Sequence, residues 1–457
     1  MFSLPVLGSN ILQSLNASVN SVWVGRFLGE AALTATSNAN IVLFLLLGLV
    51  FGISMATSIL VGQAMGRQDL EQMRRVVGTS SVFFLGLSLL VAILGYVLVE
   101  RILGWMDTPA AAMPYAIAYL KIIFIALPFM YFYNFVMMAL RGAGDSKTPF
   151  WFMLMSVGLD IVLNPMLIFG WGPLPEMGIR GSALATLIAQ SSTLVLMLAY
   201  LYKKMNPLCL GRGHLHCLKP NLEIVKLLIE KGVPMGMQML VISSSALVMM
   251  SLVNGYGTAT TAAYGVTAQI WTYVQMPALA IGASVSAMAA QNIGAGRWDR
   301  VSQITRAGLI FNTILTGLLV ALVYALGHIV FGWFLPAGSA SLPIATHINI
   351  LVAWSFILFG MTIVLLGVVR ATGAVLAPLL ILFISQWLLR IPVAAIGSQY
   401  WGENAIWWSF GLGSMMSLVL AVVYYRRGTW RNTSLLPAVD GEPTRYEGAT
   451  PTGSSGS

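Results

Sequence analysis

Twelve apolar stretches, each long enough to cross a lipid bilayer as a helix, follow one another along this chain of 457 residues. A spanning helix needs roughly 20 mostly apolar residues, whereas a spanning β-strand needs about 10 residues of alternating character. The stretches lie near residues 4–24, 38–62, 76–98, 112–139, 149–170, 182–202, 224–253, 262–289, 304–328, 345–368, 375–397 and 405–425. Because they do not alternate, we expect an all-α membrane protein with twelve transmembrane helices.

The composition agrees with a lipid surrounding. Charged residues make up 9% of the chain and hydrophobic residues 58%. A soluble domain carries about 25% charged residues, so this chain cannot cover itself with a water-exposed surface. We therefore expect the lipid bilayer to be the main partner of its outer faces.

Basic residues gather in every second connection. If residue 1 starts on the inner side, seventeen of the 24 Lys and Arg residues fall in inner connections or the C-terminal tail, and three fall in outer connections. By the positive-inside rule, this asymmetry places both termini in the cytoplasm of a cell-membrane protein. The net charge of +9 is then a topology signal, and we expect no nucleic-acid partner.

The two halves of the chain repeat each other at an offset of 228 or 229 residues. The repeated pairs include Pro5 and Pro234, Gln63 and Gln291, Gly66 and Gly294, Arg141 and Arg370, Gly144 and Gly373, and Pro149 and Pro378. Six spans in each half give two lobes that face the same way, related by a pseudo-twofold axis along the membrane normal. We expect an N-lobe at 1–202, a cytoplasmic linker at 203–223, a C-lobe at 224–428 and a disordered cytoplasmic tail at 429–457. Such duplication in an apolar chain is typical of secondary transporters.

Asp160 is the one acidic residue placed deep in a span. Burying an ionisable group costs roughly 2.5–3.5 kcal/mol on insertion scales, so the residue marks a candidate functional site. Asn164 lies one turn later on the same face, and Pro165 frees the carbonyl of Ile161 from its helical hydrogen bond. These oxygens can hold a cation, and the desolvated carboxylate can instead carry a proton. The alternative is a neutral Asp that bonds a neighbouring helix, a role that an amide would fill with less desolvation.

Several motifs resemble those of the multidrug and toxic compound extrusion (MATE) transporters. They are VNSVWVGR at 19–26 followed by Leu28-Gly29, ALRGAGDSKTP at 139–149, and GAGR at 294–297. The resemblance extends from about residue 4 to 428. It implies two six-helix lobes around a central cavity, alternating access driven by Na⁺ or H⁺, and export of amphipathic, mostly cationic organic compounds.

The resemblance also implies neighbours for Asp160. Asn20 stands where many members carry an acid, and Asp160 followed by Asn164 reverses the Asn-then-Asp order of many members. Thr186 and Asn134 are implied as further neighbours. A single carboxylate suits H⁺, whereas Na⁺ needs the additional oxygens that Asn134, Asn164 and Thr186 could supply, so both coupling ions stay open. On the first span, small and amide residues such as Asn20 also serve helix packing.

A cavity for a small organic substrate would need aromatic and adaptable side chains. Aromatic faces bind organic cations, and Met adapts to varied shapes. The candidates for such a lining are Tyr131, Tyr133, Gln238, Trp271 and Met276.

Other functions are less well supported. A lipid-linked precursor flippase of the same superfamily would need a strongly basic cavity, for which Lys121 and Arg390 are too few. An intramembrane enzyme would need His, Glu, Ser or Cys groups converging at depth, so we expect no enzyme and no cofactor. We expect the chain to act as a monomer.

Two motifs are misleading. The 142–148 segment lacks the Gly before Lys and the preceding strand of a phosphate loop, so we expect a turn and no use of ATP. The linker residues Cys209, His214, His216 and Cys217 do not have a standard zinc spacing, and we expect no metal site.

Overall fold

The computed structural model describes residues 2–170, 175–335 and 339–433, which form helices joined by short connections. The first half contains α1 (Ser3–Phe27), α2 (Gly29–Gly66), α3 (Leu70–Trp105), α4 (Met113–Gly142), α5 (Lys147–Phe169) and α6 (Ile179–Lys203). The short helix η1 (Arg212–Leu218) lies between the halves. The second half contains α7 (Leu222–Asn254), α8 (Thr258–Gly294), α9 (Trp298–Gly332), α10 (Ser341–Val352), α11 (Ser355–Ala371), α12 (Leu376–Phe383), η2 (Ile384–Arg390), α13 (Ile391–Trp401), α14 (Glu403–Arg427) and η3 (Thr429–Asn432).

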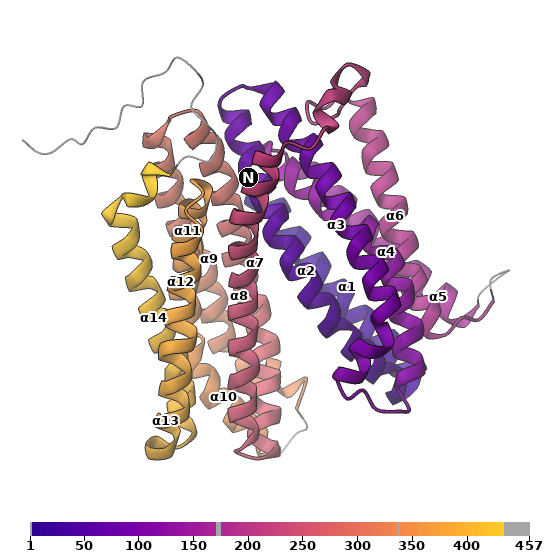
Figure 1. Cartoon of the computed structure of the whole chain (residues 1–457). Helices are drawn as coiled ribbons and strands as arrows, with labels where there is room; N and C mark the ends of the chain where they lie inside the picture. The colour runs from indigo at the N-terminus through magenta and orange to yellow at the C-terminus, as the bar shows by residue number, and fades with distance from the viewer. Residues whose placement is uncertain (1, 171–174, 336–338, 434–457) are drawn as a thin grey trace, which may run out of the picture.

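Helices α1–α6 gather on one side of the molecule and α7–α14 on the other (Figure 1). We call these groups the N-lobe and the C-lobe, and we call the end of the molecule that carries η1 the linker end. Figure 1 shows the ribbons of the two lobes adjacent near the linker end and diverging toward the opposite end. Helix α2 makes the main contact across the seam, packing on α7 and α8.

The expected all-helical membrane architecture is confirmed, and among the described residues ten or eleven of the twelve expected spans are apolar enough by themselves to cross a membrane. Ten helices are long and apolar enough to cross a membrane, including the continuous α12–η2–α13 unit, in which η2 is π-helical. The bent pair α10–α11 forms an eleventh span. Helix α1 lies at the twelfth expected position, and its many Asn, Gln and Ser residues make it less apolar than the other spans.

The tenth span is bent by 44° between α10 and α11. No Pro or Gly lies at the break, so the sequence gives no local sign of it. The Tyr324 hydroxyl of α9 lies in the gap: it accepts the backbone N–H of Trp354 (3.2 Å) and donates to the Ile350 carbonyl (3.1 Å). These two backbone groups would bond each other in an unbroken helix, so an inserted side chain causes the bend.

The repeated inner turns have the same backbone. Gly144 and Gly373 both adopt φ +94°, a conformation that Gly reaches without steric cost. After the first of these turns, the Asp145 carboxylate accepts the backbone N–H groups of Lys147 (3.0 Å) and Thr148 (2.9 Å) at the start of α5. The 142–148 segment is therefore a helix-to-helix turn, as predicted.

A pair of repeated hydrogen bonds crosses the seam at the linker end. Gln63 on α2 donates its amide to the Ala371 carbonyl (2.7 Å), and Gln291 on α8 donates to the Gly142 carbonyl (2.8 Å). The helices cross tightly there, because a Cβ on Gly66 would collide with the backbone of Gln291. Small residues allow helices in membranes to approach this closely. The linker end is therefore sealed by packing and by two pseudo-symmetric bonds.

The segment that follows α14 begins with an ordered short helix. Trp430 is 1% exposed, and its indole N–H donates to the Tyr425 carbonyl (2.8 Å) while its ring packs on Trp298. The tail predicted to be disordered from 429 thus starts with the ordered helix η3, and residues 434–457 lie outside the described part of the chain.

Candidate functional site

Asp160 lies on α5 inside the N-lobe and is 2% exposed. Its Oδ2 accepts the side-chain amide of Asn20 on α1 (2.9 Å), and its Oδ1 accepts the hydroxyl of Thr186 on α6 (3.2 Å). The side chain of Asn16 on α1 hydrogen-bonds the same carboxyl group. Three helices therefore place polar groups around a single buried carboxyl group.

Asn20 connects α1 to two positions on α5. While its amide donates to Asp160, its Oδ1 accepts the amide of Asn164 (2.7 Å). Asp160 and Asn164 can share this partner because residues four apart lie on the same helix face. These two bonds fix which atom of Asn20 is the donor and which is the acceptor.

Some side-chain oxygen atoms of these helices have no hydrogen-bond donor as a partner in the described part of the chain. The Oδ1 atoms of Asn16 and Asn164 are buried and have no hydrogen-bond partner among the described residues. Gln190, one turn beyond Thr186 on α6, has a buried Oε1 in the same state. A buried polar atom without a partner costs about 1–3 kcal/mol, so these oxygens could be satisfied by a bound cation.

The structure thus brings Asn20, Asn164 and Thr186 to Asp160. Asn134 instead donates its amide to the Met130 carbonyl on its own helix (3.0 Å). Sequence reasoning missed Asn16, although it precedes Asn20 by one helical turn and so shares its face. It also missed Tyr119 of α4, which lies within electrostatic range of Asp160 and whose position only tertiary packing sets.

The C-lobe has no counterpart of this acid. The repeat offset leads from Asp160 to Leu389, beside Arg390. Arg390 donates to Gln386 Oε1 (2.8 Å) and stacks on Phe410, with its guanidinium carbon 3.5 Å from the ring centroid. The two lobes share a scaffold, but at this repeated position one carries a buried acid and the other a leucine beside a half-buried arginine.

The five residues predicted to line a substrate cavity are all buried by packing in this structure. They are Tyr131, Tyr133, Gln238, Trp271 and Met276. Tyr131 donates to the Leu46 carbonyl (3.2 Å), and Trp271 donates to Asn349 Oδ1 (3.2 Å). Their role as the lining of a substrate cavity remains a prediction, which applies to another arrangement of the lobes.

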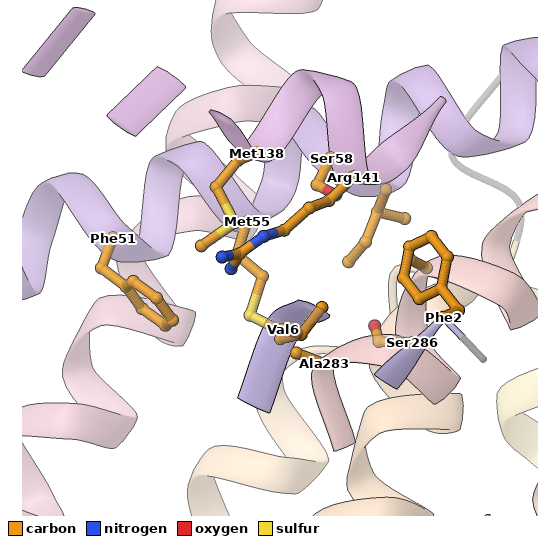
Figure 2. Close-up of a pocket in the computed structure, with 11 residues that line it drawn as sticks. Phe2, Val6, Phe51, Met55, Ser58, Met138, Arg141, Ala283 and Ser286 are labelled. Carbon is orange, nitrogen blue, oxygen red and sulfur yellow. The ribbon is translucent and has the colours of Figure 1, made fainter. Parts of the chain in front are cut away.

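A different set of residues lines a pocket between the lobes near the linker end (Figure 2). Helices α1, α2 and α4 contribute the N-lobe wall, and α8 contributes the C-lobe wall. The lining is mostly apolar and includes Phe2, Val6, Met55 and Met138, and Arg141 reaches into it with its guanidinium beside the Met side chains.

The four possible ligands in the linker do not converge on a metal. No group of three or more His, Cys, Asp or Glu side chains suited to a metal occurs within the described residues. His214 bonds Arg74 Nη1 (2.9 Å), and Cys217 is buried beside His216. Burial raises the pKa of the Cys209 thiol, partly offset by a backbone hydrogen bond from Asn206.

Ten or eleven apolar spans among the described residues, arranged in two repeated lobes with a buried polar cluster in one lobe and a pocket between the two, define a multi-pass membrane transporter. The sequence profile of the MatE family matches residues 5–166 and 234–396. The chain therefore belongs to the MATE family of membrane transporters, and it is not an enzyme.

Relatives from bacteria match nearly the whole chain. It is 38% identical over 428 residues to "Probable multidrug resistance protein YoeA" of Bacillus subtilis (strain 168), covering 93% of this chain and 92% of the relative. It is 32% identical over 436 residues to "Probable multidrug resistance protein YpnP" of the same strain, covering 95% and 96%. "Multidrug export protein MepA" of Staphylococcus aureus (strain NCTC 8325 / PS 47) is 24% identical over 427 residues, covering 93% and 92%.

Solved structures share the fold. The "outward-facing conformation of a multidrug resistance MATE family transporter of the MOP superfamily" superimposes with a TM-score of 0.86 at 19% identity, covering 93% of this chain and 94% of that one. A structure of "MATE in the straight conformation" gives a TM-score of 0.85 at 20% identity with the same coverage. At such identities the likeness shows the fold alone.

Proposed function

We propose that this protein is an antiporter that exports amphipathic, mostly cationic organic compounds in exchange for H⁺ or Na⁺ bound at Asp160. The observation that carries the proposal is the buried carboxyl group with its three hydrogen-bonding neighbours and the unpartnered amide oxygens beside it. Intramembrane acids of this kind mark ion and proton pathways. The relatives named as multidrug resistance and export proteins support the choice of substrate class.

Alternating access would move the ion and the substrate across the membrane in turn. The sealed linker end and the diverging lobes support an outward-facing state for this structure (Figure 1). In the opposite state the bonds of Gln63 and Gln291 would break and the linker end would open. A related structure is described as outward-facing, which agrees with this assignment.

The orientation and the setting belong to the same proposal. The excess of basic residues at the linker end favours its placement in the cytoplasm of a cell membrane, with both termini on that side. We propose that the chain works as a monomer, driven by an ion gradient and without ATP. Domain boundaries at 1–202, 203–223 and 224–428 would let each lobe rotate as a unit about the linker.

Dye export by intact cells tests the proposal. Cells that express the wild-type chain and are loaded with ethidium should lose the dye faster than cells that express Asp160→Asn at equal membrane abundance. The exposed acid Glu71 offers a matched control, because Glu71→Gln removes one negative charge outside the cluster. Equal export by wild type and Asp160→Asn would overturn the role of Asp160.

A further inference from the structure

Arg141 projects into the inter-lobe pocket as a buried cation. It lies at the end of α4 and is 9% exposed. Among the described residues no hydrogen bond or ion pair reaches its guanidinium, and its Nε is buried without a partner. A buried charge without a partner is strongly unfavourable, so the protein retains a cost that a ligand could relieve.

The repeat counterpart of Arg141 differs in one contact. Arg370 is equally buried, and its Nε is likewise without a partner among the described residues, but its Nη1 donates to Gln238 Oε1 (2.8 Å). The repeat offset leads from Gln238 to Ser9, whose short side chain donates to the Pro5 carbonyl of its own helix (2.9 Å). The N-lobe therefore keeps the arginine and lacks its acceptor.

A second unsatisfied group lines the same pocket from the other lobe. Ser286 on α8 has a buried hydroxyl with no partner among the described residues. Its repeat counterpart Ser58 on α2 lines the pocket as well, so the pocket lies where the two lobes present equivalent positions. A guanidinium and hydroxyl groups all donate hydrogen bonds, whereas a carboxylate or phosphate accepts them.

The remaining lining is apolar. Apolar side chains, of which Met is the most adaptable in shape, surround the guanidinium of Arg141; they include Phe2, Val6, Phe51 and Met55. This combination fits a molecule that has an apolar body and an acidic group.

We propose that Arg141 is the docking cation for the carboxylate or phosphate of an amphipathic ligand that enters this pocket when the lobes separate at the linker end. Its physiological meaning rests on the proposed export function, because it concerns those exported compounds that carry an acidic group beside their positive charge, namely zwitterions. Arg141 forms a charge-assisted bond with the acidic oxygens, and Ser286 adds a hydroxyl donor from the C-lobe.

Binding of two matched dyes to purified protein in detergent tests this inference. Rhodamine 110 carries a free carboxyl group, and rhodamine 123 is its methyl ester. Fluorescence polarisation should give a dissociation constant about ten-fold lower for the acid than for the ester, as expected for one charge-assisted hydrogen bond. Equal affinities for the two dyes would overturn the proposal.

Variants separate docking from a structural role. Arg141→Gln should abolish the preference for the acid over the ester, whereas Arg141→Lys should keep most of it. Ser9→Gln, which copies Gln238 of the C-lobe, should weaken acid binding because it supplies Arg141 with an internal acceptor. Arg306→Gln removes the same charge at an exposed position and should keep the preference. A preference that survives Arg141→Gln would contradict the inference.

Stability gives an independent readout. Because Arg141 has no partner, Arg141→Gln should leave the melting temperature of the ligand-free protein unchanged or raise it. A lowered melting temperature together with a retained acid preference would assign Arg141 to the fold and overturn the docking role.

Two further outcomes identify the ligand source and the dependence on function. A short-chain phosphatidic acid that displaces rhodamine 110 from the wild type and fails to bind Arg141→Gln would assign the site to a lipid phosphate; displacement by an organic carboxylate alone would assign it to a substrate. Acid-selective binding without export of any dye would leave this inference standing and refute the export function. Export of rhodamine 123 without acid-selective binding would refute this inference and leave the export function standing.

Discussion

Asn20 on α1 donates its amide to Asp160 on α5 and accepts the amide of Asn164 one turn further along α5. One neutral side chain therefore fixes α1 against the buried carboxyl group at two points. Where an acid at this position would place two carboxyl groups together, Asn20 leaves Asp160 as the single carboxyl group of the cluster.

Replacing Asn20 should loosen that connection. Asn20→Leu removes both hydrogen bonds and leaves the Asn164 amide without its partner, which we expect to lower stability by about 1–2 kcal/mol, since single hydrogen bonds in membranes contribute about 0.6 kcal/mol on average. Thermal denaturation in detergent measures the effect. Ser18→Ala is a control, because Ser18 is exposed and bonds its own helix. Equal melting temperatures for the two variants would argue against the Asn20 bridge.

Removing the repeated glutamine bonds should shift the balance between the two states. Gln63→Ala and Gln291→Ala each delete one bond across the linker end, and we expect each to favour the open linker end about 3- to 10-fold, the equivalent of one net hydrogen bond. Double electron–electron resonance between spin labels at Glu71 and Asp299, in a background without the two cysteines, measures the separation of the lobes.

Asn292 provides the control for this pair. It lies beside Gln291, but its amide donates to the Met288 carbonyl of its own helix (2.8 Å). Asn292→Ala should therefore leave the distance distribution unchanged. If the glutamine variants match Asn292→Ala, the two bonds do not hold the linker end closed.

The bend between α10 and α11 depends on one hydroxyl group. Tyr324→Phe keeps the ring and leaves the Trp354 N–H and the Ile350 carbonyl without the bridging oxygen, so we expect a loss of about 1 kcal/mol or a straighter span. A thermal melt measures the loss. Tyr273→Phe, at an exposed position, should have little effect. A loss in Tyr273→Phe as large as that in Tyr324→Phe would contradict this cause of the bend.

The linker thiol should respond to pH in a defined direction. Since burial raises the pKa of Cys209, less thiolate is present at neutral pH than in an exposed cysteine. In Cys217→Ser protein, iodoacetamide should modify Cys209 more slowly than free cysteine at pH 7.5, and the rate should keep rising with pH beyond the range in which free cysteine levels off. Reaction at the rate of free cysteine would show that Cys209 is not shielded.

The sequence predicted the features that a one-dimensional pattern can express. Long apolar runs, the offset pairs such as Gly144 and Gly373, and an isolated Asp160 are visible without a structure, because each follows from local composition or spacing. The bend at Trp354 is not visible, because its cause is a hydroxyl from α9. The ordered start of the tail cannot be predicted from the sequence for the same reason, since Trp430 packs on Trp298, which lies far from it along the chain.

Some features of the candidate site could likewise be predicted from the sequence, and others could not. Asn20, Asn164 and Thr186 could be named from spacing and family resemblance, and Asn16 could have been added from its one-turn spacing to Asn20. The pairing states of Arg141 and Arg370 could not, because whether a side chain of another helix reaches each guanidinium depends on tertiary packing. Which aromatic residues face a cavity also depends on how the lobes are placed.

Transport into proteoliposomes, with a pH gradient and a Na⁺ gradient imposed separately, tests the central claim most directly. The wild-type protein should move ethidium against one of the two gradients, which identifies the coupling ion. Asp160→Asn should reconstitute normally and lose gradient-driven transport, because the amide can neither release a proton nor supply a carboxylate to Na⁺. Gradient-driven transport by Asp160→Asn at the wild-type rate would contradict the account.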